Sequence, residues 1–315
     1  MIPPVLVPRK PKSVPKGSKI AVFAPASPAA AGEVEAGSSE LHRLGFEPVL
    51  LGGTAAEGYF SASADARRET FLEALGDPSI AAVVALRGGY GTNYLLDAGL
   101  CSSLKEPKCL VGYSDLTSLQ IYLWQMCAWV TFYGPMVAAG FNRSAGDARG
   151  YDRDSLLQAV RNSGGAWELS LRGQSIFAGQ AEGRVLGGCL TLVQTSLGTP
   201  WELDTTDSIL VLEDAGMRPY QVDRALMHLK LAGKFKGVRG VILGEFPSCE
   251  PPSEGSPSVL DVCRRLLVPL GIPILFGAAV GHSERPMLTI PLGIRAHFET
   301  TGEGRLAFLE AAVVG

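Results

Sequence analysis

Three short segments carry side chains that together suit the cleavage of an amide or ester bond. Ser114 stands in the tetrapeptide GYSD, where an apolar strand is expected to end and a helix to begin. A serine at such a turn projects its hydroxyl from the carboxyl edge of a sheet, where open α/β folds place their sites. The helix that follows offers free backbone N–H groups to an oxyanion. The closing glycine of G-x-S-x-G is missing and serine is a preferred N-cap, so a structural role stays open.

The second segment is the glycine-rich turn RGGYG at residues 87–91, directly after an apolar run. Its glycines permit backbone conformations and close approaches that side chains forbid, so its amides are candidates for an oxyanion hole. Neither G-x-G-x-x-G nor the Walker lysine pattern fits, which disfavours a phosphate site. An ordinary strand-to-helix turn remains the alternative interpretation.

The third group of residues comes from two places in the second half of the chain. Glu213 and Asp214 follow the apolar run SILVL, and His282 follows ILFGAAVG. A serine nucleophile needs an adjacent base that a carboxylate orients, and the chain order Ser114, Glu213, His282 supplies one of each. The alternatives are a Glu213 ion pair with a nearby arginine and a loop histidine with no catalytic role. Because all three residues follow expected strands, we favour a shared cleft.

The elements that must position these residues alternate in the first half of the chain. Near-continuous apolar strands that alternate with helices predict a parallel sheet covered on both faces. The second half is richer in strands and ends in a hairpin, which predicts a smaller mixed α/β domain with an antiparallel part. Expected strands lie at 19–24, 47–51, 80–86, 109–113, 129–133, 166–173, 185–186, 208–212, 238–243, 274–278, 294–299 and 305–309, and expected helices at 33–44, 64–75, 115–127, 152–160, 220–231 and 259–267.

Composition excludes several classes of protein. The 315 residues include 28 basic and 31 acidic side chains, for a net charge of −3, and no basic block indicates a nucleic-acid partner. The six cysteines and four histidines have no metal-binding spacing, so we expect reduced thiols and no bound metal or other cofactor. Residues 116–142 carry no charge, but Gln120 and the Gly134-Pro135 break favour a buried core over a membrane span. The proline-rich start does not look like a secretory signal, so the cytoplasm is the expected compartment.

At this point the chain resembles a known family. The blocks that carry the resemblance are RGGYGTNYLL, GYSDLTSLQ, GGCLTLVQTSLGTPWELDT, ILVLEDAGMRPYQVDRALMHL and GHSERPMLTIPLG. In order and spacing they are similar to the LD-carboxypeptidases, serine peptidases that act on murein peptides, and to their sister branch of microcin-immunity peptidases. The resemblance runs from about Lys19 to the last hairpin. One position departs from the pattern, because Cys189 stands where an asparagine is expected, which affects only the local turn.

The resemblance implies a Rossmann-like or flavodoxin-like N-terminal domain with the nucleophile and a C-terminal domain with the other two triad members. It implies roles for Ser114 as nucleophile, Glu213 as orienting carboxylate and His282 as general base, with the amides of Gly88, Gly89 and Asp115 around the oxyanion. Arg87 and Tyr90 are further candidates for binding the substrate. We accordingly expect a flexible lead-in over residues 1–17, a nucleophile domain over 18–150, a linker over 151–182 and a second domain over 183–315.

The activity implied is release of terminal D-alanine from a murein tetrapeptide in cell-wall recycling, by a homodimer in the cytoplasm. Three alternatives stay open: a microcin-immunity activity on peptidyl-nucleotides, a two-domain protein that binds a small ligand without turnover, and an esterase. A serine-directed reagent would label Ser114 only if His282 activates it, which separates the enzymes from the binding protein.

Overall fold

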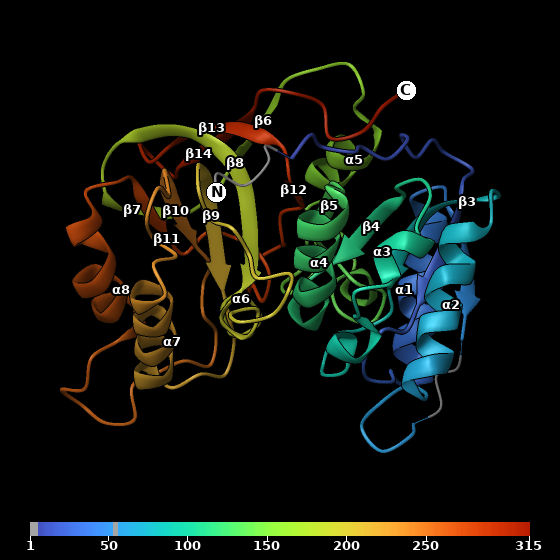
Figure 1. Ribbon diagram of the computed structural model, residues 1–315, viewed down its shortest axis with the longest axis horizontal. Coiled ribbons are helices and arrows are strands. Elements are labelled where there is room, and N and C mark those ends of the chain that lie inside the picture. The colour runs from blue at the N-terminus through green and yellow to red at the C-terminus, as the bar shows by residue number, and fades with distance from the viewer. Residues whose placement is uncertain (1–5, 53–55) are drawn as a thin grey trace.

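The computed structural model describes residues 6–52 and 56–315, which form two β-sheets side by side (Figure 1). The first sheet has six strands in the order β12-β5-β4-β3-β1-β2. Its strands from the N-terminal half all pair in parallel, as predicted, and β12 from the far end of the chain pairs antiparallel with β5. The bounds are β1 (Lys19–Phe23), β2 (Glu47–Leu51), β3 (Ile80–Ala85), β4 (Cys109–Gly112), β5 (Thr131–Tyr133) and β12 (Ile290–Leu292).

The second sheet has eight strands in the order β6-β14-β13-β8-β9-β10-β11-β7. Its centre, β8 to β11, is parallel, and its two margins are antiparallel, which confirms the mixed architecture expected for this half. The bounds are β6 (Trp167–Ser170), β7 (Gln174–Phe177), β8 (Gln180–Cys189), β9 (Ser208–Glu213), β10 (Gly240–Leu243), β11 (Ile274–Phe276), β13 (Arg295–Glu299) and β14 (Arg305–Phe308).

The helices lie where apolar periodicity and capping residues place them. Ser63 caps α2, Asp152 caps α5 and Ser258 caps α8, each accepting a hydrogen bond from a backbone N–H of the first turn. Short elements such as β7, β12 and α6 escape sequence analysis because they span too few residues to show a period. The bounds are α1 (Ala31–Arg43), α2 (Ala64–Gly76), α3 (Leu100–Ser103), α4 (Thr117–Cys127), α5 (Arg153–Arg161), α6 (Leu190–Thr195), α7 (Pro219–Leu231) and α8 (Val259–Leu267), with 3-10 turns η1 (Thr92–Leu95), η2 (Ser114–Leu116), η3 (Phe141–Arg143) and η4 (Val268–Leu270).

Helix α4 joins the two halves and lies between them (Figure 1). Leu119 and Leu123 pack in the core of the first sheet, whereas Ile121 and Trp124 pack in the core of the second. A helix that buries opposite sides against two sheets has to be apolar all round, which explains the uncharged stretch in the sequence. Among the described residues, no helix is long and apolar enough to cross a membrane.

Two segments are more ordered than the sequence indicates. Residues 151–182, the expected linker, contain α5 and the strands β6 and β7, and both strands are hydrogen-bonded into the second sheet. The expected lead-in is held at Arg9, whose amide donates to the carbonyl of Ala128 (2.7 Å), and at Ser13, whose amide donates to that of Val314 (2.7 Å). Both segments gain order from sheet or bridge partners far away in sequence. Residues 1–5 lie outside the described residues, and the limits of the domains stay a prediction.

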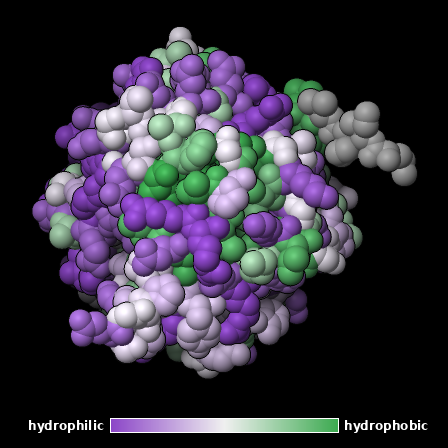
Figure 2. Space-filling model, turned by 90° about the vertical axis from the view of Figure 1, so that its left-hand side faces the viewer, coloured by the Kyte–Doolittle hydropathy of each residue, from purple (hydrophilic) through white to green (hydrophobic). Residues whose placement is uncertain are grey.

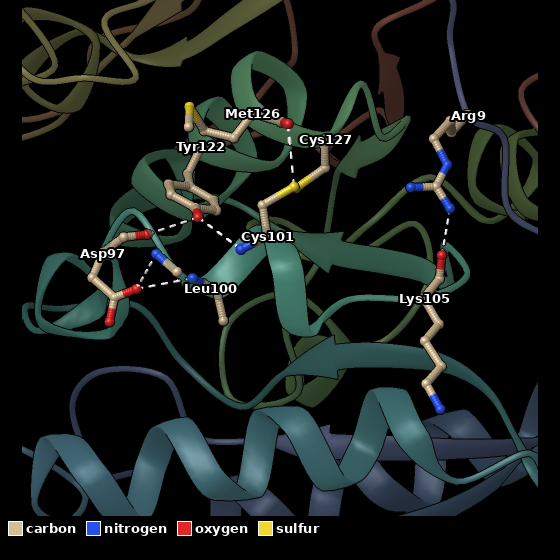
Figure 3. Close-up of a disulfide and its surroundings, with 9 residues drawn as sticks. Arg9, Asp97, Leu100, Cys101, Lys105, Tyr122, Met126 and Cys127 are labelled. Atoms are coloured by element: carbon tan, nitrogen blue, oxygen red, sulfur yellow. Dashed lines mark hydrogen bonds between the residues drawn. A yellow bond between two sulfur atoms is a disulfide. The ribbon is translucent and has the colours of Figure 1, made fainter.

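The expectation of reduced thiols is wrong for two cysteines. Cys101 in α3 and Cys127 at the end of α4 are joined as a disulfide, with their Cα atoms 6.0 Å apart (Figure 3). Tyr122, also in α4, accepts a hydrogen bond from the Cys101 amide (2.9 Å) and donates one to the Asp97 carbonyl (2.8 Å). The two cysteines are 26 residues apart, and the sequence does not indicate that they pair, because only the packing of α3 on α4 brings them together. The other four cysteines are free and buried.

Candidate active site

Ser114 stands at a strained turn between β4 and α4. Its φ is +61°, a left-handed conformation that costs a serine free energy and that typifies nucleophile turns on α/β sheets. The residue opens the 3-10 turn η2, so its neighbour Asp115 lies in a first turn whose N–H groups lack helical partners. The structure therefore realises the strand–turn–helix context predicted for GYSD.

The glycine loop at 87–91 meets this turn directly. A Cβ atom on Gly88 would lie 3.5 Å from the Asp115 nitrogen and only 3.0 Å from Ser114 Cβ and 3.1 Å from its Oγ, and the last two distances are shorter than most Cβ contacts. A glycine here lets the loop backbone run close to the hydroxyl without displacing it. In the part of the chain that the structure describes, no backbone carbonyl accepts the N–H of Gly88 or Gly89. The Gly88 backbone therefore lies beside the Ser114 side chain and the Asp115 amide.

Glu213 and His282 form a hydrogen-bonded pair, as the sequence predicts. Glu213 ends β9 and is buried, with 1% of its side chain exposed. Its Oε2 accepts both the His282 backbone N–H (2.9 Å) and the His282 Nδ1 (2.8 Å). Because a carboxylate can only accept, Nδ1 carries a proton, which leaves Nε2 as the basic nitrogen. Gly281 permits this contact, because a Cβ there would lie 2.2 Å from Glu213 Cδ.

The pair perturbs the pKa of each partner. Burial by itself raises the pKa of Glu213, but the charge of His282 and the bonds from His282 and Tyr133 outweigh it and hold that pKa below its usual value. Burial lowers the pKa of His282, but the Glu213 charge and hydrogen bond prevail, so its pKa lies above the ordinary 6.5. Glu213 is thus ionised at neutral pH and stabilises an imidazolium at His282.

Tyr133, which sequence analysis did not single out, connects the two sheets at this point. It ends β5, beside Gly112 of β4, and it is fully buried. Its hydroxyl donates to Oε1 of Glu213 and accepts the Ser114 backbone N–H at 3.4 Å. Burial, and then the Glu213 charge, raise the pKa of Tyr133 far above its usual value, so the hydroxyl remains a donor. A tyrosine at the carboxyl end of a strand neighbouring the GYSD strand was the signal available.

The glycine loop is fixed at its far end by two buried charged side chains. The Asp115 carboxylate accepts hydrogen bonds from the Thr92 amide (2.8 Å) and hydroxyl (2.6 Å). Arg67 of α2 donates to the carbonyl of Gly91 (2.8 Å) and to that of Pro25. Burial raises the pKa of Asp115 despite the Thr92 bonds and the Arg67 charge. Asp115 therefore places its own amide beside Ser114 and holds the loop through its side chain.

A second carboxylate holds the segment that carries His282. Glu245 follows β10, the neighbour of β9, and accepts the Glu284 backbone N–H (2.6 Å) and the Arg285 guanidinium. Arg285 in turn donates to the carbonyls of Arg172 (2.6 Å) and Gly277. Glu213 and Glu245, at or just after the ends of adjacent strands, thus accept the backbone N–H groups of His282 and of Glu284, two residues further on. Sequence analysis missed Glu245 and Arg285, although both lie in or near the blocks that it quoted.

The other residues that sequence analysis singled out lie outside the Glu213–His282 hydrogen-bond network. Arg87 is exposed and donates to the Pro28 carbonyl (3.2 Å), and Tyr90 is 47% exposed with its amide bonded to the Ser27 hydroxyl (3.3 Å). Cys189, in register with Glu213, is buried with its thiol 3.5 Å from Asp214 Oδ2. Asp214 also accepts the amide of Thr191 (2.9 Å) and not any bond from His282. The described residues gather no group of three His, Cys, Asp or Glu side chains that could hold a metal ion.

Tyr113 links the serine turn to the His282 ring. The Tyr113 ring, directly before Ser114, lies edge-on to the His282 ring at 4.9 Å between centroids. No hydrogen bond joins Ser114 Oγ to His282 within residues 6–52 and 56–315. The structure therefore brings the serine turn, the glycine loop and the Glu213–His282 pair together at the interface of the two sheets.

Comparison with known proteins agrees with this geometry. A model of the LD-carboxypeptidase N-terminal domain matches residues 20–134, and a model of the LD-carboxypeptidase C-terminal domain matches residues 182–298. The first match holds Ser114 and the glycine loop, and the second holds Glu213 and His282. The two halves of the candidate site therefore lie in the two matched regions.

Three relatives describe the range of the family. A probable murein peptide carboxypeptidase of Bacillus subtilis is 34% identical over 96% of this chain and 95% of its own length. A muramoyltetrapeptide carboxypeptidase of Oxalobacter formigenes has a solved structure with a TM-score of 0.79 and 28% identity, covering 93% of this chain and 99% of that one. The microcin C7 self-immunity protein MccF of Escherichia coli is 28% identical over 86% of this chain and 87% of its own length.

A solved structure of MccF in complex with aspartyl sulfamoyl adenosine covers 97% of this chain and 100% of that chain, with a TM-score of 0.87 and 24% identity. At that identity the likeness shows the two-sheet fold alone. The domain matches and the Bacillus relative go further, because they span nearly the whole chain and include every block that carries the resemblance. The chain therefore belongs to the LD-carboxypeptidase family, a family of serine-type carboxypeptidases.

Proposed function

We propose that this protein is a serine carboxypeptidase that releases the terminal D-alanine of a murein tetrapeptide by cleaving the bond after its L-configured centre. Ser114 is the nucleophile, His282 the general base and Glu213 the carboxylate that orients it. The observation that carries the proposal is the Glu213–His282 hydrogen bond of 2.8 Å at the interface where the strained Ser114 turn and the glycine loop meet. The murein peptide relatives support the substrate class.

In the first half of the reaction, His282 Nε2 takes the Ser114 proton as Oγ bonds to the carbonyl carbon. The carbonyl oxygen becomes an oxyanion, which the amides of Gly88, Gly89 and Asp115 stabilise. Glu213 stabilises the imidazolium, and Tyr133 keeps the Glu213 carboxylate in place through its second oxygen. His282 then returns the proton to the departing nitrogen, the C–N bond breaks, and D-alanine leaves with its free carboxylate.

The second half repeats these steps with water. His282 accepts a proton from water as the water oxygen bonds to the acyl carbon. The second oxyanion collapses, the bond to Ser114 Oγ breaks, and His282 reprotonates the serine. Substrate is consumed as one peptide and one water, and the products are a shortened peptide and D-alanine.

An exopeptidase needs a cation for the leaving carboxylate, and Arg87 is our candidate. The residue is exposed at the start of the glycine loop, and its charge lowers the pKa of the buried Tyr113 beside His282, although burial and Glu213 raise that pKa more strongly. A guanidinium there pairs with a carboxylate through charge-assisted hydrogen bonds. Arg87→Ala should raise KM for the tetrapeptide, and unchanged KM and kcat would remove Arg87 from the site.

The direct test is mass spectrometry of the tetrapeptide L-Ala-D-Glu-meso-diaminopimelate-D-Ala after incubation with the protein. Wild type should remove one D-alanine, and Ser114→Ala should not. Ser102→Ala, an exposed serine on α3, is the matched control and should match wild type. Equal cleavage by wild type and Ser114→Ala would reject the assigned nucleophile.

A second candidate function is the microcin-immunity type, in which the same residues cleave a peptidyl-nucleotide. The 28% identity with MccF over most of both chains favours testing it beside the first. Cleavage of an aminoacyl sulfamoyl adenosine, with no cleavage of the tetrapeptide, would replace the murein assignment and keep the triad.

Assembly as a homodimer in the cytoplasm stays a prediction. Figure 2 shows hydrophobic side chains gathered in the middle of the face that carries the second sheet, away from the first one. Contiguous apolar surface is typical of association sites. Light scattering on purified protein at two concentrations measures the mass directly, and a mass of one 33.2 kDa chain at both would exclude a stable dimer.

A further inference from the structure

A cluster of aromatic rings lies on the surface beside the glycine loop, and neither the triad nor the oxyanion hole uses it. Centroid distances between neighbouring rings run from 4.5 Å to 6.0 Å, so each ring contacts at least two others. We call this cluster the aromatic platform, and its members are Tyr59, Phe60, Tyr90 and Tyr94.

The platform is open to solvent. The exposed fraction is 62% for Tyr59, 47% for Tyr90 and 54% for Tyr94. Exposed large rings normally occur singly, as at Tyr220, where the Arg224 guanidinium covers the ring at 5.4 Å. Three exposed tyrosines, of which Tyr90 contacts the other two, keep apolar area in water that folding does not require, which is typical of a binding surface.

The platform is rigidly attached to the catalytic loop. Arg67 lies 4.9 Å from the Phe60 ring centroid, and the same guanidinium donates to the Gly91 carbonyl. Tyr90 belongs to the loop itself, and its amide is bonded to the Ser27 hydroxyl. Tyr90 is the second residue after Gly88, so their Cα atoms lie within about 7.6 Å of each other. The platform therefore begins close to Ser114, and its rings are held before a ligand arrives.

The chemistry of the proposed reaction decides which part of a substrate reaches the platform. On the leaving side an exopeptidase accommodates a single alanine, which is too small for a surface of four rings. On the acyl side a murein peptide continues for three residues, a span of at most about 11 Å, and then joins a lactyl ether on an amino sugar. A pyranose presents C–H faces that pack on aromatic rings and hydroxyls that pair with tyrosine hydroxyls.

We propose that the aromatic platform is a subsite for the sugar ring of a muramoyl-peptide substrate. The proposal rests on the proposed function and deepens it, because it assigns specificity for the sugar-bearing peptide over the free peptide. The platform side chains are uncharged, and the Arg67 beneath them is already bonded to carbonyl groups, which matches a neutral ring better than a phosphate.

The test compares kcat/KM for muramoyl-tetrapeptide and for the free tetrapeptide in wild type and in Tyr94→Ala. Wild type should favour the muramoyl substrate, and Tyr94→Ala should reduce that preference about tenfold, the usual effect of removing one aromatic contact. Tyr220→Ala, an equally exposed tyrosine (58%) on α7, is the matched control and should keep the wild-type preference. The same preference in wild type and Tyr94→Ala would overturn the proposal and leave the proposed function intact.

Binding to the inactive Ser114→Ala variant distinguishes a failure of the sugar-subsite proposal from a failure of the proposed function. Calorimetry is carried out with muramoyl-tripeptide and with adenosine monophosphate. Muramoyl-tripeptide should bind Ser114→Ala, and the double variant Ser114→Ala/Tyr94→Ala should bind it about tenfold more weakly. This result without turnover of any murein substrate would reject the proposed function and keep the subsite. Tyr94-dependent binding of adenosine monophosphate alone would reassign the platform to a nucleobase and overturn the proposal. A Tyr94→Ala effect on dimer mass alone would also overturn it, in favour of self-association.

Discussion

The two sheets contribute to the candidate site in different ways. The first sheet supplies a strained Ser114 turn and a glycine loop in which Gly88 lies beside the Ser114 hydroxyl, with Asp115 and Arg67 as buried supports. The second sheet supplies charged side chains at strand ends, where Glu213 and Glu245 hold the His282 segment. Stabilisation of an oxyanion needs fixed donors, whereas proton transfer needs a tuned pKa, and the proposed mechanism assigns one of these tasks to each sheet.

The largest expected effect is at Ser114, which the first sheet supplies. Ser114→Ala should lower kcat/KM for the tetrapeptide about 10,000-fold or more, because the nucleophile is lost. Ser114→Gly should be equally inactive but more stable than Ser114→Ala by about 1 kcal/mol, because glycine adopts the left-handed φ without strain. Urea unfolding of both variants measures this difference, and equal stability would show that the turn relaxes without cost.

The next largest effect is expected at the second sheet, which supplies the charged side chains. Glu213→Gln should lower kcat about 1,000-fold, because an amide neither selects the reactive His282 tautomer nor stabilises its cation. Asp214→Asn alters the adjacent carboxylate, which bonds to Thr191 and not to His282, and its loss should be far smaller. Steady-state kinetics of the two variants decides which strand-end carboxylate serves the base, and a larger loss at Asp214 would contradict our assignment.

A smaller effect tests whether Glu245 is a positioning residue. Glu245→Ala should lower kcat about 10-fold to 100-fold with little change in KM, because the His282 segment loses one of its two carboxylate anchors. Glu245→Gln, which can still accept the Glu284 N–H, should recover most of the rate. Glu168→Ala, which removes an exposed ion pair with Arg305, is the control for general loss of charge.

The Glu245 test needs a measurement that a purely structural role would not change. The His282 imidazole signal in NMR should titrate at a lower pH in Glu245→Ala, because a looser segment weakens its contact with Glu213. A lower melting temperature with unchanged kcat and unchanged His282 titration would leave Glu245 with a structural role only.

The smallest expected effect is the dependence on pH. His282 acts as a base only when neutral, and Glu213 raises its pKa above 6.5, so kcat/KM should rise with pH through a midpoint above 6.5. Below that midpoint the rate should fall about tenfold per pH unit. Glu213→Gln removes the charge that raises the pKa, so the midpoint of its residual activity should move to lower pH. A wild-type midpoint below 6.5 would show that burial prevails at His282.

Much of the fold was accessible from sequence because its signals are local. The strands of the first sheet are apolar runs bounded by turns, and strand ends place Ser114 and Glu213 at sheet edges, whereas His282 lies in a loop six residues after β11. Local patterns did not indicate which residues act together. That grouping came from chemistry, because a serine nucleophile requires a base and a carboxylate. The choice of Glu213 over Asp214 drew on the resemblance to a known family, because periodicity alone does not tell which way adjacent residues at a strand end point.

Other features depended on contacts between distant segments. Tyr133 and Glu213 are 80 residues apart, and the pairing of β12 with β5 brings residues 290–292 to the first sheet. The disulfide between Cys101 and Cys127 likewise follows from the packing of α3 on α4. No local pattern encodes such pairs, because their members lie far apart in the sequence and meet only through the packing of distant segments.

The sequence by itself determined the residue types of the site, their order and the strand ends at Ser114 and Glu213, because hydrophobic periodicity and turn chemistry act over a few residues. Only the tertiary structure decided how Tyr133 spans the two sheets, what holds the glycine loop and the His282 segment, and where four aromatic rings gather. Those features depend on distances between segments far apart in the chain, and such distances are set by the packing of one sheet against the other.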